Sequence, residues 1–502
     1  MFDLTSSDLL MVHSSFAHRS LLRWRAVNAP TSRVPTALAV VCGCLLTFPL
    51  WQSPVWTAAP SATPALALDR DAAAAFKKGD YDRVIRLLEA YPPGHVPSRE
   101  SLTLALQSYL RVGRPEAAFT TYSRIVKAGQ PDHASLLREV ALGFLTSRVR
   151  DSEEYIRIAA YTALAEVASR GTGPFLEDGL LDSSVLVRGR AAEGIGRAGL
   201  AATSPGLRRA LQDPVPAVRI AAINALGDAK VSSVSDHLIR TARSEEGPEH
   251  VFALAALYKL GKTDTLVDIL NAATLPEADI RMAALGVLGR LKHPAILSRL
   301  SQSVYDPDPS VRAFAAGALG EFGDPGGVAA LTHALEDENP RVRSIAAASL
   351  GRLGLNSTRL LLQQAARDPI ELVRAGAVEG LLRLGDGEAV LVAADMAKHP
   401  DPSVRGAAAQ ALGVRGQVKA LSVLESLLAD QQPQPRLMVA RALGKIGGRE
   451  VLPLLKKALQ DGDPAIRIAA AGSVLQALAS MKTKLNPTRR AVSVQGVPCC
   501  GS

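Results

Sequence analysis

The sequence predicts an all-α protein, an α-solenoid of stacked helical hairpins, on three observations. A pattern such as DENPRVRSIAAASLGRLG, at residues 337–354, recurs many times at near-constant spacing. Apolar residues within each copy recur at the spacing of one helix face. Aromatic residues make up only 4% of the 502-residue chain, and all three tryptophans lie in the first 56 residues. The repeats must therefore pack through small and aliphatic side chains.

Residues 1–67 read as an export signal or membrane anchor. The apolar stretch VPTALAVVCGCLLTFPLW spans residues 34–51, four arginines precede it, and no basic residue follows until Arg70. This charge asymmetry places the following chain outside the cytoplasm, either exported, in a periplasm, or anchored in the cytoplasmic membrane with the repeats outside. Pro35 and Pro49 shorten the helical part of this stretch to a length nearer to the apolar core of a signal peptide than to a full membrane span. Cleaved signal and retained anchor both stay open.

Residues 68–132 predict two helical hairpins, each turning at a glycine, Gly79 in the first and Gly113 in the second. Leu110, Ala118 and Tyr122 stand in order around the second glycine. The step from one glycine to the other, about 34 residues, resembles the period of the tetratricopeptide repeat, although the large aromatic residue of its first helix is missing. The resemblance implies a cap or adaptor.

Residues 133–480 carry eleven units that align on one position. The anchor residues are Arg157, Arg188, Arg219, Ala253, Arg281, Arg312, Arg343, Arg374, Arg405, Arg436 and Arg467. Steps between them are 31 residues, except for steps of 34 and 28 on either side of Ala253. Three residues past the anchor stands Ala in ten units, and eight residues past it stands Gly in eight. Such a helix face lets a neighbouring helix approach closely.

The ends of these helices are marked too. Six units have Pro three residues before the anchor, often after Asp or Asn, and many have Gly eleven residues past it. Cap and proline predict a helix start, and the glycine predicts a left-handed stop. A second apolar segment upstream completes each hairpin. Because one hairpin cannot bury both its apolar faces, we expect a continuous stack, a curved rod roughly 100 Å long at ~9 to 10 Å per helix.

The pattern of Asp, then Val or Ile with Arg, then Ala and Leu-Gly, resembles the HEAT repeat, an armadillo-like helical module. Its period resembles the short HEAT-like units of phycobilisome lyases. The resemblance covers residues 133–480 and implies a fold more than a function, because such units serve scaffolds, inhibitors and a few enzymes.

The resemblance also implies a structural ladder of Asp and Arg side chains within or between units. The ladder residues are Asp151, Arg157, Asp182, Arg188, Asp213, Arg219, Asp306, Arg312, Asp337, Arg343, Asp368, Arg374, Arg405, Asp430, Arg436, Asp461 and Arg467. The pattern fails at Gly247, Ala253 and Leu275, which predicts a looser joint around residues 244–280.

Charge and composition narrow the function classes. The net charge is +9, but residues 1–67 carry +2 of it and the basic tail at 481–502, expected to be flexible, carries +4. The near-neutral body makes nucleic acid a poor partner. None of the nine histidines precedes Glu, whereas His-Glu pairs hold iron in HEAT-like deoxyhypusine hydroxylases. We expect no catalytic, metal or cofactor site. The role of Cys499 and Cys500 stays open.

The remaining candidate site is a basic row nine residues past the anchors. It comprises Arg197, Lys262, Arg290, Arg352, Arg383 and Lys445, with Glu166, Asp228 and Glu321 between the earlier members. The row suits a protein partner with an acidic segment, and equally suits solvated residues that favour the helix C-terminal dipole. The prediction is a noncatalytic protein-interaction scaffold. A bilin-lyase-like or other HEAT-like enzyme is the alternative, and nucleic-acid binding comes third.

Overall fold

The second helix of each hairpin begins and ends where its capping residues stand. In the sixth unit the Asp308 carboxylate accepts a hydrogen bond from the Ser310 N–H, and Pro309 opens helix α17 (Pro309–Phe322). Gly323 ends the helix with a φ of 76°. Glycines at the same place in five other units also have positive φ, namely Gly199, Gly354, Gly385, Gly416 and Gly447. The predicted stop glycines are thus confirmed in most units, whereas in the ninth unit the helix Pro402–Ala411 ends before Gly416.

The computed structural model describes residues 64–91, 97–126, 130–244, 247–293 and 295–484. All regular structure within these ranges is helical, which confirms the predicted all-α class. The predicted export segment at 34–51, the cysteines and nearly all of the basic tail lie outside the described residues.

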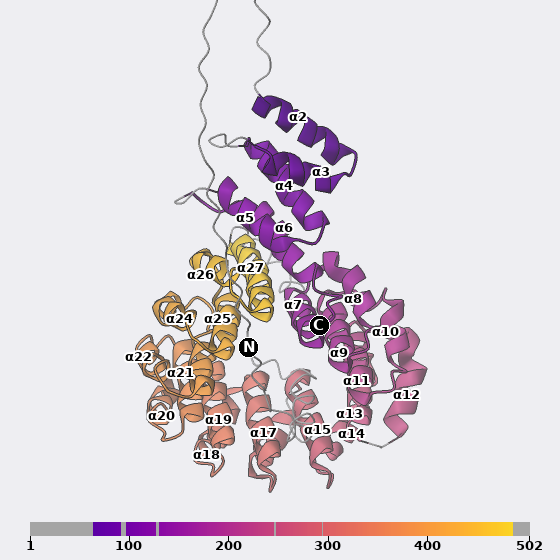
Figure 1. The fold of residues 1–502 in the computed structure, drawn as a ribbon. Helices are drawn as coiled ribbons and strands as arrows, with labels where there is room; N and C mark the ends of the chain where they lie inside the picture. Colours follow the sequence, from indigo (N-terminus) through magenta and orange to yellow (C-terminus); the bar gives the residue numbers. More distant parts are fainter. Residues whose placement is uncertain (1–63, 92–96, 127–129, 245–246, 294, 485–502) are drawn as a thin grey trace, which may run out of the picture.

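The first four described helices form an arm that stands on the rest of the molecule (Figure 1). They are α2 (Pro64–Lys77), α3 (Tyr81–Glu89), α4 (Arg99–Arg111) and α5 (Pro115–Ile125). Gly79 and Gly113 turn the chain with positive φ between the helices of each pair. Ala72, Ala75 and Val84 form a small core of their own, and α5 packs against the first helix of the repeats.

Eleven helical hairpins follow, each with a first helix on the outside and a second helix on the inside (Figure 1). The first helices are α6 (Ala134–Thr146), α8 (Gly173–Gly179), α10 (Pro205–Ala210), α12 (Ser235–Arg243), α14 (Thr265–Ala272), α16 (Ile296–Gln302), α18 (Val328–Ala334), α20 (Arg359–Ala365), α22 (Ala389–Met396), α24 (Leu421–Leu427) and α26 (Leu452–Ala458). Besides α17, the second helices are α7 (Glu154–Val167), α9 (Val185–Arg197), α11 (Pro216–Asp228), α13 (Glu249–Lys259), α15 (Ala278–Leu291), α19 (Pro340–Leu353), α21 (Glu371–Arg383), α23 (Pro402–Ala411), α25 (Pro433–Ile446) and α27 (Pro464–Lys484).

The stack closes into a ring, whereas the sequence predicted a curved rod. Each second helix packs on the next, and α27 packs on α7 and α6, so that the cycle is complete (Figure 1). Small residues along the second helices bring these helices close together on the inside. Neighbouring inner helices contact each other more extensively than neighbouring outer helices do, which curves the stack until its two ends meet.

Side chains from both ends of the array hold the seam. A Cβ built on Gly472 of α27 would lie 3.0 Å from the Cβ of Ala163 in α7, so the two helices touch directly. Lys456 Nζ lies 2.8 Å from Asp132 Oδ1, and Arg467 Nη2 lies 3.4 Å from Glu116 Oε1. Among the described residues α27 alone is long and apolar enough to cross a membrane, and more than half of that segment is buried, as in a core helix.

The Arg and Asp side chains of the repeat join consecutive units. Arg312 donates through Nε and Nη2 to the two carboxylate oxygens of Asp337, at 2.7 and 2.9 Å, and through Nη1 to the Asp306 carbonyl. The arginine and the aspartate of each such pair belong to successive units. The same two-pronged bond joins Arg157 to Asp182, Arg188 to Asp213, Arg281 to Asp306, Arg343 to Asp368, Arg405 to Asp430, and Arg436 to Asp461.

Some residues of the ladder have other partners than the regular Arg–Asp pair, which is called a rung below. Arg219 binds Glu249, and Arg467 binds Glu116 of the arm, which supplies the last unit with a carboxylate across the seam. Asp151, ahead of the first anchor, accepts from Arg148. Arg374 binds Glu371 of its own helix, because His399 stands where the next unit would supply the aspartate.

The structure corrects the register of the fourth unit, where His250 and not Ala253 occupies the anchor position. Gly261 has a φ of 100°, as the stop glycine eleven residues past an anchor does. Gly227 faces Ala256, the contact that its counterpart Gly196 makes with Ala225. All steps between anchors are then equal. The sequence misleads here because Gly261 also stands eight residues past Ala253, the place of a packing glycine.

Candidate interaction surface on the inner face of the ring

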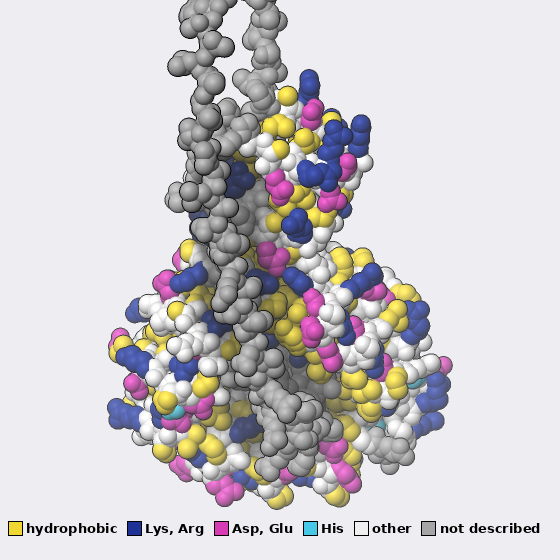
Figure 2. All heavy atoms as spheres, in the orientation of Figure 1, with side chains coloured by type: hydrophobic (Ala, Val, Ile, Leu, Met, Phe, Trp, Pro, Cys, Tyr) yellow, Lys and Arg dark blue, Asp and Glu magenta, His cyan; other side chains and the backbone are white. Residues whose placement is uncertain are grey.

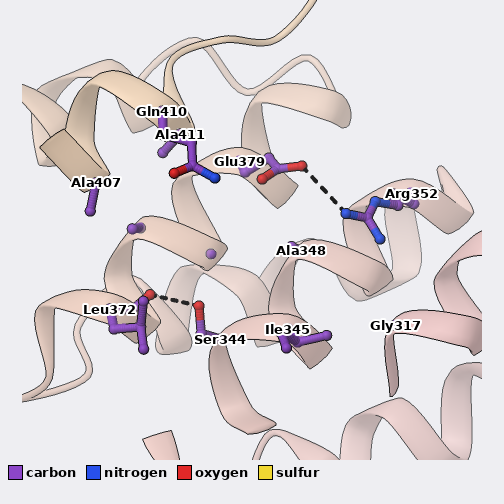
Figure 3. Close-up of a pocket in the computed structure, with 12 residues that line it drawn as sticks. Gly317, Ser344, Ile345, Ala348, Arg352, Leu372, Glu379, Ala407, Gln410 and Ala411 are labelled. Atoms are coloured by element: carbon purple, nitrogen blue, oxygen red, sulfur yellow. Dashed lines mark hydrogen bonds and ion pairs between the residues drawn. The ribbon is translucent and has the colours of Figure 1, made fainter. Parts of the chain in front are cut away.

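An apolar groove crosses the inner helices α17, α19, α21 and α23. Ile345 and Ala348 of α19, with Leu372 and Ala375 of α21, form much of its floor, and Ala407 closes it from α23 (Figure 3). Its volume is about 90 Å³. Leu372 is 45% exposed and Ile345 is half-buried, so these side chains are available to a ligand. On α19, the residues two, five and nine positions past the anchor therefore face the inside.

Two charged side chains lie at the polar end of this groove. The Glu379 carboxylate accepts hydrogen bonds from Arg383 at 2.9 and 3.2 Å and lies 3.9 Å from Arg352. Its side chain is only 8% exposed. Figure 3 shows Glu379 and Arg352 directed toward each other from neighbouring helices. Two members of the basic row are thus neutralised from within the protein.

The structure brings five of the six predicted row residues to equivalent places. Arg197, Arg290, Arg352, Arg383 and Lys445 each lie near the end of an inner helix, nine residues past its anchor. Lys262 does not, because α13 ends at Lys259 and Lys262 follows the left-handed Gly261. The equivalent residue is Lys259, which contacts the carboxylate of Asp228. The row is therefore a series of cations with local carboxylate partners over much of its length.

The surroundings of Lys445 disfavour its charge. Burial lowers its pKa, the carboxylates of Glu379 and Glu166 oppose this effect, and Arg441 and Arg383 add to it. Its side chain is exposed to solvent where it lines a hollow at the ring seam, beside Arg138 and Arg415. This hollow is the larger of the two sites, at about 470 Å³.

Sequence reasoning missed two kinds of residue here. Glu379 stands five residues past its anchor, a position that the repeat analysis did not follow, although an acid there is a visible departure from Gly, Ala or Gln in neighbouring units. Arg138 and Arg415 lie in α6 and after α23, far apart in the chain. No sequence pattern pairs them, because ring closure alone brings them together.

Over the part of the chain that the structure describes, no group of three or more His, Cys, Asp or Glu side chains could hold a metal ion. Figure 2 shows Lys and Arg side chains spread around the ring margin and mixed with Asp and Glu on this face. The side chains that line the groove and the hollow offer apolar contact, hydrogen bonding and charge pairing.

Several solved structures are similar to parts of this chain. Human deoxyhypusine hydroxylase in complex with glycerol is 20% identical over 50% of this chain and 98% of its own, with a TM-score of 0.29. The CpcE–CpcF complex of phycocyanin lyase from Nostoc sp. PCC7120 is 19% identical over 48% and 94%, with a TM-score of 0.35. Kap121p bound to Pho4p is 15% identical over 78% and 54%, with a TM-score of 0.32. TM-scores this low support no functional argument.

No curated protein matches the chain in sequence. The family model for HEAT repeats matches residues 173–256, 296–367, 358–436 and 425–492, together more than half of the 502 residues. The matched segments contain most of the ladder arginines, most of the packing glycines and nine of the eleven inner helices in whole or part. The chain therefore belongs to the HEAT repeat family.

Proposed function

We propose that the protein is a noncatalytic scaffold that binds a segment of a partner protein on the inner face of the ring. The observation that carries the proposal is the apolar groove over α17 to α23, with Leu372 and Ile345 accessible beside the Glu379 and Arg352 pair. An accessible apolar strip with a polar end suits apolar side chains of a peptide together with one hydrogen-bonding group.

The acidic partner segment expected from the basic row needs revision under this proposal. Glu379 already binds Arg383 and lies close to Arg352, so an acidic segment gains little over the groove itself. Acidic groups would gain most near Lys445, beyond the groove. The tetratricopeptide-like arm, α2 to α5, would offer a second partner surface, since it stands clear of the ring.

The scaffold hypothesis is tested by crosslinked pull-down from the envelope fraction of the native host. Ile345→Glu places a charge in the groove at a half-buried position, and Leu391→Glu places the same charge on outer helix α22, where Leu391 is 66% exposed. We expect a partner captured by the native chain and by Leu391→Glu and lost by Ile345→Glu. Equal capture by all three chains would contradict binding in the groove. A bilin or metal that copurifies with the chain would favour the enzyme alternative.

The location belongs to the same proposal. We infer from the charge asymmetry around residues 34–51 that the repeats act outside the cytoplasmic membrane, exported or tethered through that segment. A reporter enzyme that is active only outside the cytoplasm, fused after residue 132, should be active, and Leu45→Arg should abolish its activity because a charge disfavours membrane insertion. Reporter activity unaffected by Leu45→Arg would exclude this route.

A further inference from the structure

The hollow at the ring seam is built from both ends of the repeat array. Arg138 comes from α6, Glu166 from α7, Arg415 from the turn after α23, Lys445 from α25 and Gln476 from α27. Its volume of about 470 Å³ falls within the range of small-molecule sites. Because α27 must pack on α6 and α7 to bring these residues together, the hollow exists only in the closed ring.

The charges in this hollow are unbalanced. Three cations, Arg138, Arg415 and Lys445, share it with a single carboxylate, that of Glu166. Glu166 lies within hydrogen-bond distance of the Gln476 amide, at 3.5 Å. Within the described ranges none of the three cations has a carboxylate at ion-pair distance, whereas ladder arginines on the same array bind carboxylates in two-pronged bonds.

Such a site gains stability from an anion. Of the charges near Lys445, the carboxylates of Glu379 and Glu166 favour its protonated form, and Arg441 and Arg383 oppose it. An oxygen anion would reduce the mutual repulsion of the three cations that line the hollow and accept hydrogen bonds from Arg138 and Arg415, whose planar guanidinium groups suit carboxylate or phosphate oxygens. The hollow is larger than one such group, so it would hold part of the molecule that carries the anion as well.

We propose that this hollow, lined by Arg138, Arg415 and Lys445, is a binding site for an oxyanion, a carboxylate or phosphate group, and that ligand binding requires the closed ring. The inference is independent of the scaffold function, since the site lies at the seam and not over the groove of α17 to α23. Because the ligand contacts both ends of the array, it stabilises closure by mass action.

The test uses the full chain in chloride buffer, with inorganic phosphate and a polyglutamate peptide as separate probes at constant ionic strength. Isothermal calorimetry measures affinity for native protein, Lys445→Gln and Arg415→Gln. Removing one of the cations should weaken binding about tenfold or more. Lys457→Gln on α26 and Arg367→Gln after α20 are matched controls, because both side chains are exposed on the outside, and they should bind like the native protein.

The outcomes separate the possible sources of the anion. Saturable binding of phosphate identifies a free anion, and binding of the peptide alone identifies a carboxylate from a protein segment. Binding of neither probe, or equal weakening by the controls, overturns the site. Ile345→Glu in the groove should leave anion binding unchanged, so that failure of the scaffold proposal and failure of this site are distinguishable.

The requirement for closure has its own variant. Gly472→Trp places a large side chain against Ala163 at the α27–α7 contact and should open the seam without unfolding the individual hairpins. Circular dichroism checks that helix content is kept, and small-angle scattering checks that the molecule expands. We expect anion binding to be lost. Native affinity in an expanded ring would overturn the link between the site and closure.

Discussion

Two neighbouring joints between inner helices differ in both of the interactions that couple the repeats. Between α19 and α21, Gly351 lies directly against Gly380, and Arg343 binds Asp368. Between α21 and α23, Leu382 stands at the glycine position and His399 at the aspartate position. Accordingly α21 and α23 contact each other much less extensively than α19 and α21 do.

The joint between α13 and α15 repeats the second arrangement. Tyr258 occupies the glycine position there, His250 the arginine position, and Leu275 the aspartate position. Its helices also have one of the smaller contacts in the ring. Close packing and the ladder therefore fail together, at two places, and divide the ring into two arcs. In repeat proteins stability depends on nearest-neighbour interfaces, so these joints are where the ring should bend most easily.

The joint between α21 and α23, called the wide joint from here on, also explains the position of the groove. Ala407, Gln410 and Ala411 of α23 line the same cavity as Leu372 and Glu379 of α21. A leucine in place of glycine keeps α23 from packing down on α21, so the space between their inner faces stays open. Loss of tight coupling and gain of a candidate binding surface have one cause.

The largest effect should come from filling the tight joint. A Cβ at position 351 would lie 2.2 Å from the Cα of Gly380, which is backbone and cannot move aside locally. Gly351→Leu should therefore destabilise the protein by about 3 kcal/mol or more. Urea unfolding followed by circular dichroism measures the change. Leu382→Met in the wide joint is the control, because it conserves volume and should cost less than about 1.5 kcal/mol. A shift of the urea midpoint as large as that of Gly351→Leu would contradict the difference between the joints.

Breaking a ladder rung should have the next largest effect. Asp337→Ala removes the carboxylate that accepts from Nε and Nη2 of Arg312, whose side chain is only 12% exposed, and that accepts from the Asn339 N–H. We expect the free energy of unfolding, measured by thermal or urea denaturation, to fall by about 2 kcal/mol. Glu371→Ala in the wide joint removes a more exposed partner, that of Arg374, and its melting temperature should stay close to native. Equal losses of stability in Asp337→Ala and Glu371→Ala would mean that the Arg–Asp pairs do not account for the difference between the two joints.

The same rungs predict loss of stability in acid. Burial raises the pKa of Asp337, but hydrogen bonds from Arg312 and the Asn339 N–H outweigh it and lower the pKa. The pKa values of Asp213, Asp368 and Asp430 are lowered by equivalent partners. A carboxyl with a lowered folded pKa stabilises the fold above its unfolded pKa of about 4 and loses that contribution as pH falls through the folded value. The melting temperature should therefore decrease as the pH is lowered below about 4, and it should decrease less steeply in Asp337→Ala.

Sequence reasoning reached the helices and the ladder but not the ring. Caps such as Asp308 and stops such as Gly323 act within a few residues, so local sequence is enough to predict them. Closure depends on a small tilt summed over eleven units, which no single repeat encodes. The register slipped at Gly261 because two glycines with different roles, packing and helix stop, are three residues apart in the pattern. The proximity of Arg138 and Arg415 could not be predicted either, because it depends on closure of the ring.

Amide exchange should distinguish the joints with a smaller effect. Few buried contacts lower the free energy of local opening, and a tenfold faster exchange corresponds to about 1.4 kcal/mol. We expect amides of α13, α14 and the start of α15, and those of α22 and α23, to exchange about tenfold faster than those of α17 and α19. Mass spectrometry of peptic fragments measures this. Uniform protection around the ring would mean that the two joints are as stable as the others.

The smallest change should restore a rung at the wide joint. His399→Asp places a carboxylate where the regular pairs have it relative to Arg374, and it can take over the hydrogen bond from the Asp401 N–H that His399 Nδ1 now accepts. Because such an ion pair is partly exposed to solvent, we expect it to raise the free energy of unfolding by only roughly 0.5 kcal/mol. His399→Asn is the matched control, since it has the same shape and can accept that bond without a charge. A melting temperature raised by Asp and not by Asn would attribute the weakness to the missing rung. Equal values would attribute it to Leu382, whose bulk sets the helices too far apart for any pair of charges at this joint to matter.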